Sequence, residues 1–438
     1  MRMALAPGNR TGAAPAPPVT SVQKEQTMTA APQQARRGRA LRLVTRLTCL
    51  GAAVLLLWPL LPQAGGPKMV ASASPFVAIC SGIAARTVGL GALVGLAAGA
   101  ISLLRRRWFC RYACPVGLLL EGACRVGLRR SSWWTRCPPF GQYVALLTVA
   151  GAVVGYPVLL LLDPLSMLSS AFGLRGADGL LTGVLATTGV GILVLSTLLF
   201  GTLWCSRFCP LGGTQELLAS VGSLAARRRK DEPGTSPSQP PPAGGTVLAR
   251  RALLAGAAGV GLGLWARKAG ATRSGSGPLR PPGAVEEDRF TGLCVRCGNC
   301  VRTCPSRIVH PDLGEAGLTG LLAPLVRFNE EYCREDCNAC TQGCPSGALR
   351  GLDLQHKRLH VIGRARLDRS VCILVQGEGE CAACLHCCPV DAIRTAFDKK
   401  EYVSYPAIDL GRCNGCGACQ VVCPTQPVKA MRVEGIGR

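Results

Sequence analysis

Sixteen cysteines in the last third of the chain form four short motifs, and each motif ends in Cys-Pro. The first and last motifs share the spacing Cys-x2-Cys-x2-Cys-x3-Cys-Pro, and the two between them are looser variants. In this pattern three closely spaced thiolates ligate one [4Fe–4S] cluster, and the cysteine before proline ligates the partner cluster. In chain order the motifs comprise Cys294, Cys297, Cys300 and Cys304; Cys333, Cys337, Cys340 and Cys344; Cys372, Cys381, Cys384 and Cys388; and Cys413, Cys416, Cys419 and Cys423.

Iron–sulfur clusters explain these motifs better than zinc or disulfides do. Structural zinc sites use pairs of Cys-x2-Cys, and disulfides do not account for four motifs with one shared ending. The thiolates suffice for four [4Fe–4S] clusters. Two pairings stay open: motif 1 with 4 and 2 with 3, or neighbouring motifs with each other. In motif 3, Cys387 competes with Cys388 as a ligand, and the following Pro389 favours Cys388.

A second cysteine pattern, Cys-x3-Cys-Pro-x-Gly, occurs twice in the first half of the chain. The two copies contain Cys110 and Cys114, and Cys205 and Cys209. Repeats in membrane proteins build a shared site at their interface, so these four cysteines predict a redox or metal centre there. The alternative is that they are packing residues or isolated thiols. Cys124 and Cys137 lie in the same loop as the first copy.

Composition indicates a membrane protein. The 438 residues are 48% hydrophobic but only 5% aromatic, the mean hydropathy is +0.27, and the formal net charge is +24. Because the arginines cluster beside apolar runs, the positive-inside rule explains the charge better than nucleic-acid binding does. None of the four histidines lies in the apolar half, and no Cys-x2-Cys-His occurs, which argues against haem.

Four uncharged apolar runs predict four membrane-spanning helices. They are Leu47–Gly66, Thr87–Leu104, Tyr143–Leu162 and Leu180–Trp204. The loop from Arg105 to Gln142 holds eight arginines against one acid, whereas the loops at 67–86 and 163–179 hold few charges. The arginine-rich side is therefore predicted to be cytoplasmic, with both ends of this part inside.

A shorter apolar stretch, Ala252 to Trp265, follows Arg250-Arg251. It is typical of a twin-arginine export signal placed inside the chain, which would carry a folded, cluster-loaded domain across the membrane, and Ala269-Gly270-Ala271 offers a cleavage pattern. The alternative is a short membrane-lying or packed helix. Segments such as Leu349–Ile362 and Ala392–Tyr402 predict short strands between the cysteine motifs.

The predicted fold is a membrane α-helical part with a short fifth apolar helix, followed by an α+β poly-[4Fe–4S] domain. The predicted parts are a disordered tail (1–40), a four-helix membrane part with both Cys-x3-Cys-Pro copies (41–216), a proline-rich linker (217–248), the twin-arginine-like segment (249–271) and the four-cluster domain (285–438). The acidic residues beside the apolar runs, Glu121, Glu216 and Asp163, either accept protons or only cap helices and form turns. No catalytic residue is assigned.

The two halves resemble known families over about residues 40–430. The membrane half, with Cys-x3-Cys-Pro-x-Gly after its second and fourth runs, resembles NapH, the membrane quinol-oxidising subunit of periplasmic nitrate reductase systems, and the related methylamine-utilisation protein MauN. The C-terminal half, with its twin-arginine start and the stretched Cys372-x8-Cys381, resembles NapG and MauM and is expected to be ferredoxin-like.

This resemblance implies a multi-pass protein of the bacterial inner membrane with a periplasmic ferredoxin domain. It implies quinol as the electron donor, and as partners the quinone pool and a redox protein, either a reductase or a cytochrome. Two alternatives stay open. A cytoplasmic ferredoxin domain would couple a soluble donor to the quinone pool, or the chain would be a non-enzymatic maturation or redox-sensing partner of a metalloenzyme.

Overall fold

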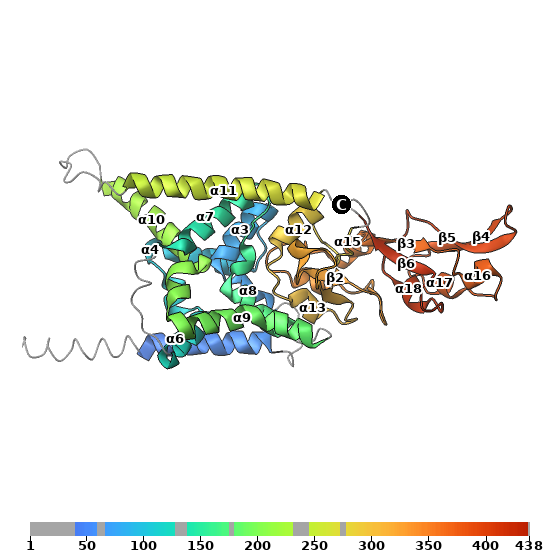
Figure 1. Cartoon of the computed structure of the whole chain (residues 1–438), viewed down its shortest axis with the longest axis horizontal. Helices are drawn as coiled ribbons and strands as arrows, with labels where there is room; N and C mark the ends of the chain where they lie inside the picture. The colour runs from blue at the N-terminus through green and yellow to red at the C-terminus, as the bar shows by residue number, and fades with distance from the viewer. Residues whose placement is uncertain are drawn as a thin grey trace, which may run out of the picture.

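The molecule is elongated, with a helical part at one end and the cysteine domain at the other (Figure 1). The structure is a computed structural model that describes residues 40–58, 66–127, 138–174, 179–230, 245–271 and 277–436. The described helices of the helical part are Ala40–Leu57, α2 (Lys68–Ser72), α3 (Pro75–Ala85), α4 (Ala92–Leu104), α5 (Trp108–Tyr112), α6 (Pro115–Val126), α7 (Phe140–Val153), η2 (Leu160–Leu162), α8 (Pro164–Gly173), α9 (Leu180–Phe200), η3 (Trp204–Phe208), α10 (Pro210–Lys230) and α11 (Gly245–Ala271).

The prediction of four membrane-spanning helices is wrong. Among the described residues, two helices are long and apolar enough to cross a membrane, Ala40–Leu57 and α9. The helices α4 and α7 have 13 and 14 residues, or about 20 Å of helix against a hydrocarbon core of about 30 Å. The run expected to reach Leu162 ends at Val153, because Gly155 adopts φ +87° and Pro157 follows it.

Two segments expected to be loops are helical and contribute to the core. The segment 67–86 contains α2 and α3, and the segment 163–179 contains α8. Phe76 and Val77 in α3 and Leu165 in α8 are almost fully buried. The helical part is therefore a compact assembly of mostly short helices. The segment 217–248 also differs from the expected linker, since α10 extends to Lys230; residues 231–244 and the expected tail, up to residue 39, lie outside the described residues.

The helix α11 is longer than the expected fifth apolar helix. It includes Arg250, Arg251 and the apolar stretch after them in one helix of 27 residues, which is about 40 Å long. It packs closely along α7, since a Cβ at Gly259 would lie 2.2 Å from the carbonyl oxygen of Leu147. These contacts correspond to the packed-helix alternative, and the cleavage pattern at 269–271 falls inside α11.

The cysteine domain consists of two modules in line, the first with motifs 1 and 2 and the second with motifs 3 and 4 (Figure 1). Its elements are α12 (Glu287–Leu293), α13 (Asn299–Thr303), β1 (Val309–Pro311), η4 (Leu318–Gly320), β2 (Pro324–Val326), α14 (Ala339–Gln342), α15 (Leu354–Leu359), β3 (Gly363–Leu367), α16 (Ile373–Gln376), α17 (Ala383–His386), β4 (Ile393–Asp398), β5 (Val403–Ile408), α18 (Ala418–Val422) and β6 (Met431–Gly435).

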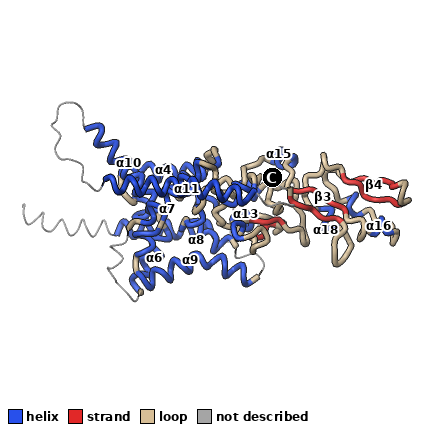
Figure 2. The backbone as a smooth tube through the Cα atoms, turned by 45° about the horizontal axis from the view of Figure 1, so that its top comes forward, coloured by secondary structure: helices blue, strands red, loops and turns tan. Residues whose placement is uncertain are grey.

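These strands form three antiparallel pairs, β1–β2, β3–β6 and β4–β5 (Figure 2). The pair β3–β6 joins the chain before motif 3 to the chain after motif 4, so it closes the second module. The segment 349–362, expected to contain a strand, forms α15 instead, whereas β4 lies within 392–402 as expected.

One buried core joins the helical part to the first module. It includes Leu165 and Leu168 of α8 together with Phe290 and Leu293 of α12. Across the same boundary the hydroxyl groups of Tyr156 and Thr291 lie 3.2 Å apart. The first module therefore shares its core with the helical part and is not packed as a separate body.

Candidate iron–sulfur cluster sites

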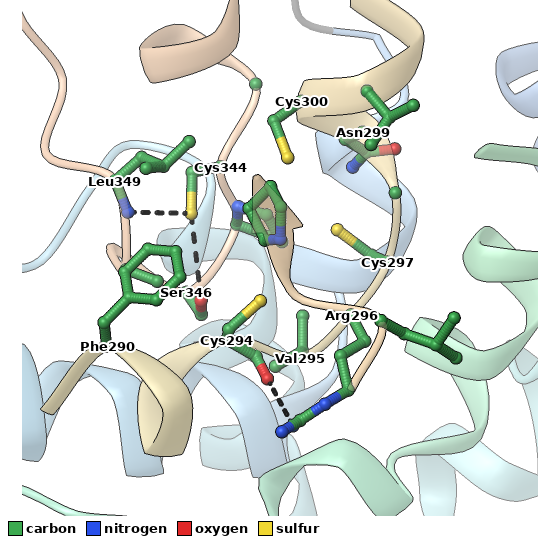
Figure 3. Close-up of a pocket in the computed structure, with 17 residues that line it drawn as sticks. Phe290, Cys294, Val295, Arg296, Cys297, Asn299, Cys300, Cys344, Ser346 and Leu349 are labelled. Carbon is green, nitrogen blue, oxygen red and sulfur yellow. Dashed lines mark hydrogen bonds between the residues drawn. The ribbon is translucent and has the colours of Figure 1, made fainter. Parts of the chain in front are cut away.

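The first cluster site, site I, lies where the cysteine domain meets the helical part. Its pocket is lined by three cysteines of motif 1 and the last cysteine of motif 2: Cys294, Cys297, Cys300 and Cys344. Figure 3 shows the four sulfur atoms around one space, with Leu349 N donating to Cys344 Sγ at 3.4 Å. Cys344, the last cysteine of motif 2, therefore lies with three cysteines of motif 1, which is the exchange that the spacing predicts.

Site II brings together the remaining cysteines of motifs 1 and 2, which are Cys304, Cys333, Cys337 and Cys340. Burial raises the pKa of the Cys340 thiol to about 12, and the neighbouring thiols of Cys333, Cys304 and Cys337 add to the rise. Sites I and II together use every cysteine of motifs 1 and 2.

The second module repeats this exchange. Site III is the pocket lined by Cys372, Cys381, Cys384 and Cys423. Site IV comprises Cys388, Cys413, Cys416 and Cys419. Burial raises the pKa of Cys416 to about 11, and the thiols of Cys388 and Cys413 contribute. Of the two pairings that the sequence leaves open, the structure has the neighbouring motifs paired.

Cys388 and Cys387 differ in their hydrogen bonds. Cys388 Sγ accepts from Ala392 N at 3.3 Å, in the same way that Cys344 Sγ accepts a backbone N–H in site I. The Cys387 thiol instead donates to the carbonyl oxygen of Cys384 at 3.5 Å. These hydrogen bonds favour Cys388 as the ligand, although the Cys387 thiol also lies close enough to Cys419 to raise the pKa of that thiol. That Cys387 is a spare thiol stays a prediction.

Glycines allow the chain to turn tightly within motifs 1 and 4. Gly298 and Gly417 precede the third cysteine of their motifs with φ +71° and +87°, a conformation that costs glycine little. Gly298 also lies against α8, where a Cβ would be 2.9 Å from Leu174 Cδ2. The same residue therefore shapes motif 1 and holds site I against the helical part.

The four sites lie in the order I, II, IV, III along the molecule. Sites I and II are adjacent. The Cys340 thiol of site II lies close enough to the buried Cys300 of site I to contribute to its raised pKa. Sites II and IV are joined by a hydrogen bond of 2.9 Å from Cys333 N to the carbonyl oxygen of Cys416. Sites IV and III meet where α17 packs against α18. Site I is thus next to the helical part, and site III is at the far end, near α16 (Figure 1).

The donor sets fit [4Fe–4S] clusters. Burial raises the pKa of Cys297 and Cys300, so ligation has to displace the thiol proton, which the positive charge of iron does. At Cys423 burial also raises the pKa, but hydrogen bonds, chiefly from the Thr425 hydroxyl, outweigh it and lower the pKa. No three His, Cys, Asp or Glu side chains in the described part of the chain converge closely enough to hold a single metal ion.

The four cysteines of the Cys-x3-Cys-Pro copies also come together, and we call them the quartet: Cys110, Cys114, Cys205 and Cys209. Burial raises the pKa of each of the four thiols. The neighbouring thiols raise these pKa values further, and in each of the six possible pairs at least one thiol raises the pKa of the other. The quartet lies inside the helical part, where the two copies meet. Cys137 lies outside the described residues.

Sequence reasoning missed two side chains around the quartet. Gln215 Nε2 donates to Cys110 Sγ at 3.0 Å, although Gln215 comes from the other copy. Arg46 comes from the N-terminal helix, and its charge favours the thiolate of Cys205. The two copies of the repeat share a glycine and a glutamate, which mark only their own positions. The sequence pattern therefore does not indicate Gln215 or Arg46.

The three acidic residues singled out in the sequence all have structural partners. Glu121 forms an ion pair with Arg46, and Glu216 forms one with Arg107 at 2.9 Å. Asp163 caps α8, where it accepts from a backbone N–H of the first turn at 2.9 Å. Burial raises the pKa of Asp163 to about 6 despite its hydrogen bonds.

Comparison with known proteins agrees with both groups of sites. A family model described as a 4Fe-4S dicluster domain matches residues 293–348 and 379–426. Another, described as a 4Fe-4S binding domain, matches residues 87–133 and 182–230, which contain the two Cys-x3-Cys-Pro copies. The ferredoxin-type protein NapG of Escherichia coli K12 is 34% identical over 182 residues, which are 38% of this chain and 74% of NapG. The chain belongs to the MauM and NapG family of ferredoxin-type proteins.

Two MauM proteins extend this comparison. MauM of Methylorubrum extorquens is 34% identical over 170 residues, 37% of this chain and 76% of that protein. MauM of Methylophilus methylotrophus is 32% identical over 151 residues, 33% of this chain and 66% of that protein, just under two thirds of its length. No solved structure is significantly similar to the chain. The chain is thus an iron–sulfur electron-transfer protein of this family, and the resemblance of its helical part to NapH and MauN stays a prediction.

Proposed function

We propose that the chain is a membrane-bound electron carrier, which takes electrons from quinol and passes them through four [4Fe–4S] clusters to a reductase or cytochrome. Oxidation of one quinol to quinone releases two electrons and two protons, and the clusters, when bound, supply one-electron transfer. The observation that carries this proposal is the order of the sites, from the helical part at site I to the far end at site III.

A single line of sites suits transfer between two separate places. Site I shares a buried core with α8 and α12, so it is shielded on the side of the helical part. Site III lies beside the β4–β5 hairpin at the opposite end of the molecule (Figure 1). An electron donor associated with the helical part is therefore nearest to site I, and a soluble acceptor reaches site III most easily.

The two candidate spans support attachment to a membrane. In Ala40–Leu57 and in α9, respectively 11% and 17% of the apolar window is buried inside the protein. Most of these apolar side chains, such as Leu55 and Ile192, are therefore exposed. Water-soluble proteins rarely expose contiguous apolar surface on this scale, whereas a lipid environment covers it without cost.

The course of α11 supports a periplasmic cysteine domain. Arg107, which follows Arg105 and Arg106, donates to the carbonyl oxygens of Cys205 and Ser206 beside the quartet. The positive-inside rule assigns this arginine-rich end of the helical part to the cytoplasm. The helix α11 begins at that end and runs the length of the helical part to the cysteine domain (Figure 1). Arg267, whose charge at the far end opposes this orientation, pairs with Asp288 at 2.8 Å.

Protease access in spheroplasts tests this orientation. The cysteine domain of the parent chain should be cleaved from outside, and the variant with Arg250→Lys and Arg251→Lys should lose that access if the pair directs export. Protection of the domain in the parent chain would instead favour a cytoplasmic domain that couples a soluble donor to the quinone pool.

Reduction by quinol in isolated membranes tests the electron path. In a Cys337→Ala variant, which lacks a ligand of site II, quinol should bleach the absorption of site I while sites III and IV stay oxidised. Cys387→Ala, which removes the spare thiol, is the matched control and should behave like the parent chain. Reduction of sites III and IV at the parental rate in Cys337→Ala would contradict the order, and no reduction of any site in the parent would exclude quinol as the donor.

A further inference from the structure

We propose that Lys357 is a positioning residue for electron transfer between the two modules, because its buried ammonium group raises the reduction potential of site II. Lys357 lies in α15, the short helix between motif 2 and motif 3. The inference concerns the charge beside one site, so it does not depend on which molecule donates electrons to the chain.

Lys357 is a buried lysine outside any ion pair. Only 6% of the residue is exposed, whereas lysine is almost never buried without a partner. On one side of it, Arg334 pairs with Asp336 at 3.3 Å. On the other side, Arg358 lies 4.0 Å from Glu335. Neither ion pair includes Lys357, so its positive charge has to be balanced by a different group.

The ammonium group of Lys357 lies at the start of motif 2. Its Nζ donates to the carbonyl oxygen of Arg334, the residue that follows the site II ligand Cys333. Burial raises the pKa of the Cys333 thiol, and both the charge of Lys357 and a hydrogen bond from its ammonium group oppose that rise. The backbone contact and the hydrogen bond to sulfur together place a positive charge beside one ligand of site II.

The residues around Lys357 fix its position between the modules. The helix α15 begins after Asp353, whose carboxylate accepts from His356 N at 2.7 Å. At the other end of the helix, the carbonyl oxygen of Arg358 accepts from Asn414 Nδ2 at 3.4 Å. Asn414 belongs to motif 4. Lys357 therefore lies where the first module meets the second, with its ammonium group on the side of site II.

A buried positive charge changes the reduction potential of a neighbouring cluster in a definite direction. A [4Fe–4S] group held by four thiolates carries a net negative charge, and each electron that it accepts adds one negative charge. Lys357 therefore stabilises the reduced state more than the oxidised state, since net charge and hydrogen bonds to sulfur both help to set the potential. Burial strengthens this effect, because water screens an exposed charge far more than a buried one.

Arginines at the neighbouring sites contact the backbone of the ligands. Arg296 Nη1 donates to the carbonyl oxygen of Cys294 in site I at 2.9 Å. Arg364 Nη1 donates to the carbonyl oxygen of Cys413 in site IV at 2.8 Å. Both arginines are partly exposed. At site II the cation is buried and bonds to a ligand sulfur, so an electron at site I is drawn to site II, next to the second module.

A redox titration of the full chain, purified without oxygen and followed by electron paramagnetic resonance, tests the proposal. In Lys357→Met, which keeps an unbranched side chain without the charge, the equilibrium constant for reduction of site II should fall about tenfold, a shift of about 59 mV for a one-electron couple. The shifted signal belongs to site II if it is absent from Cys337→Ala. Arg358→Gln is the matched control, since it removes a half-exposed charge from the same helix and should leave every potential unchanged.

Iron analysis separates an effect on the potential from loss of the cluster. Lys357→Met should retain all the iron of the parent chain, and unchanged potentials in that variant would overturn the proposal, because Lys357 would then only hold the backbone at Arg334. If Lys357→Met loses iron, Lys357→Gln, which keeps a hydrogen-bond donor but no charge, should retain the iron and show the lowered potential. Loss of about four irons in both variants would make Lys357 a residue for cluster assembly and would likewise overturn the proposal.

Discussion

Replacement of Cys344 by alanine should remove the cluster of site I, although Cys344 belongs to motif 2 in the sequence. In the structure Cys344 lines a pocket with three cysteines of motif 1, and the other three cysteines of motif 2 lie in site II. The consequence can be counted, because each [4Fe–4S] cluster contributes about four irons. Cys344→Ala alone should therefore cost about four irons per chain.

Pairs of substitutions distinguish the two assignments. Cys300 shares site I with Cys344, so the double variant Cys300→Ala with Cys344→Ala should lose no more than the same four or so irons. Cys337 belongs to site II, so Cys337→Ala with Cys344→Ala should lose about eight. If each motif served a single cluster of its own, the two results would be exchanged. Iron and acid-labile sulfide analysis of full-length chains purified without oxygen provides the measurement.

Equal losses in the two double variants would mean that loss of one cluster unfolds the whole first module, because both assignments then predict the same loss. A third double variant controls for this outcome. Cys344→Ala combined with Cys384→Ala disrupts one site in each module and should again remove about eight irons.

Three further predictions concern single positions. Gly173→Ala should destabilise the contact between α8 and motif 1 by a few kcal/mol, because its Cβ would lie 2.6 Å from the carbonyl oxygen of Cys297; Gly183→Ala in α9, with no neighbour within 4 Å, should raise the thermal midpoint instead. Since burial raises the pKa of Asp163 to about 6 from 3.8, the folded chain binds its proton more tightly than the unfolded chain, and stability should fall by about 3 kcal/mol as the pH rises through that interval. Asp163→Asn, which keeps a capping side chain, should flatten this dependence in thermal melts between pH 4 and pH 7.5, and an unchanged slope would be evidence against it. Asn299→Leu should retain the iron and shift the potential of site I alone, because both polar atoms of the buried Asn299 amide lack a protein partner beside that pocket; unaltered potentials would mean that the amide does not interact with the cluster.

The membrane prediction shows what a hydropathy pattern determines and what it does not. The apolar runs of the helical part are real, but hydropathy does not show where a helix stops. Gly155, with its positive φ, ends α7 early, and α4 begins only at Ala92. The segments 67–86 and 163–179 were expected to be loops with few charges, yet Phe76 and Leu165 in them are buried. Burial of such segments depends on contacts with residues far away in the chain, and no local window contains those contacts.

The sequence by itself determined the cluster chemistry, because the ligands of each triad are close neighbours in the chain and the spacing of cysteines and proline is a local property. The same holds for the repeat that supplies the quartet. Only the tertiary structure decided which motifs are paired and that the four sites lie in the order I, II, IV, III. It also decided that Gln215 and Arg46 lie beside the quartet. These features depend on long-range packing, such as Gly298 against α8 and β3 against β6, in which residues separated by many positions have to meet.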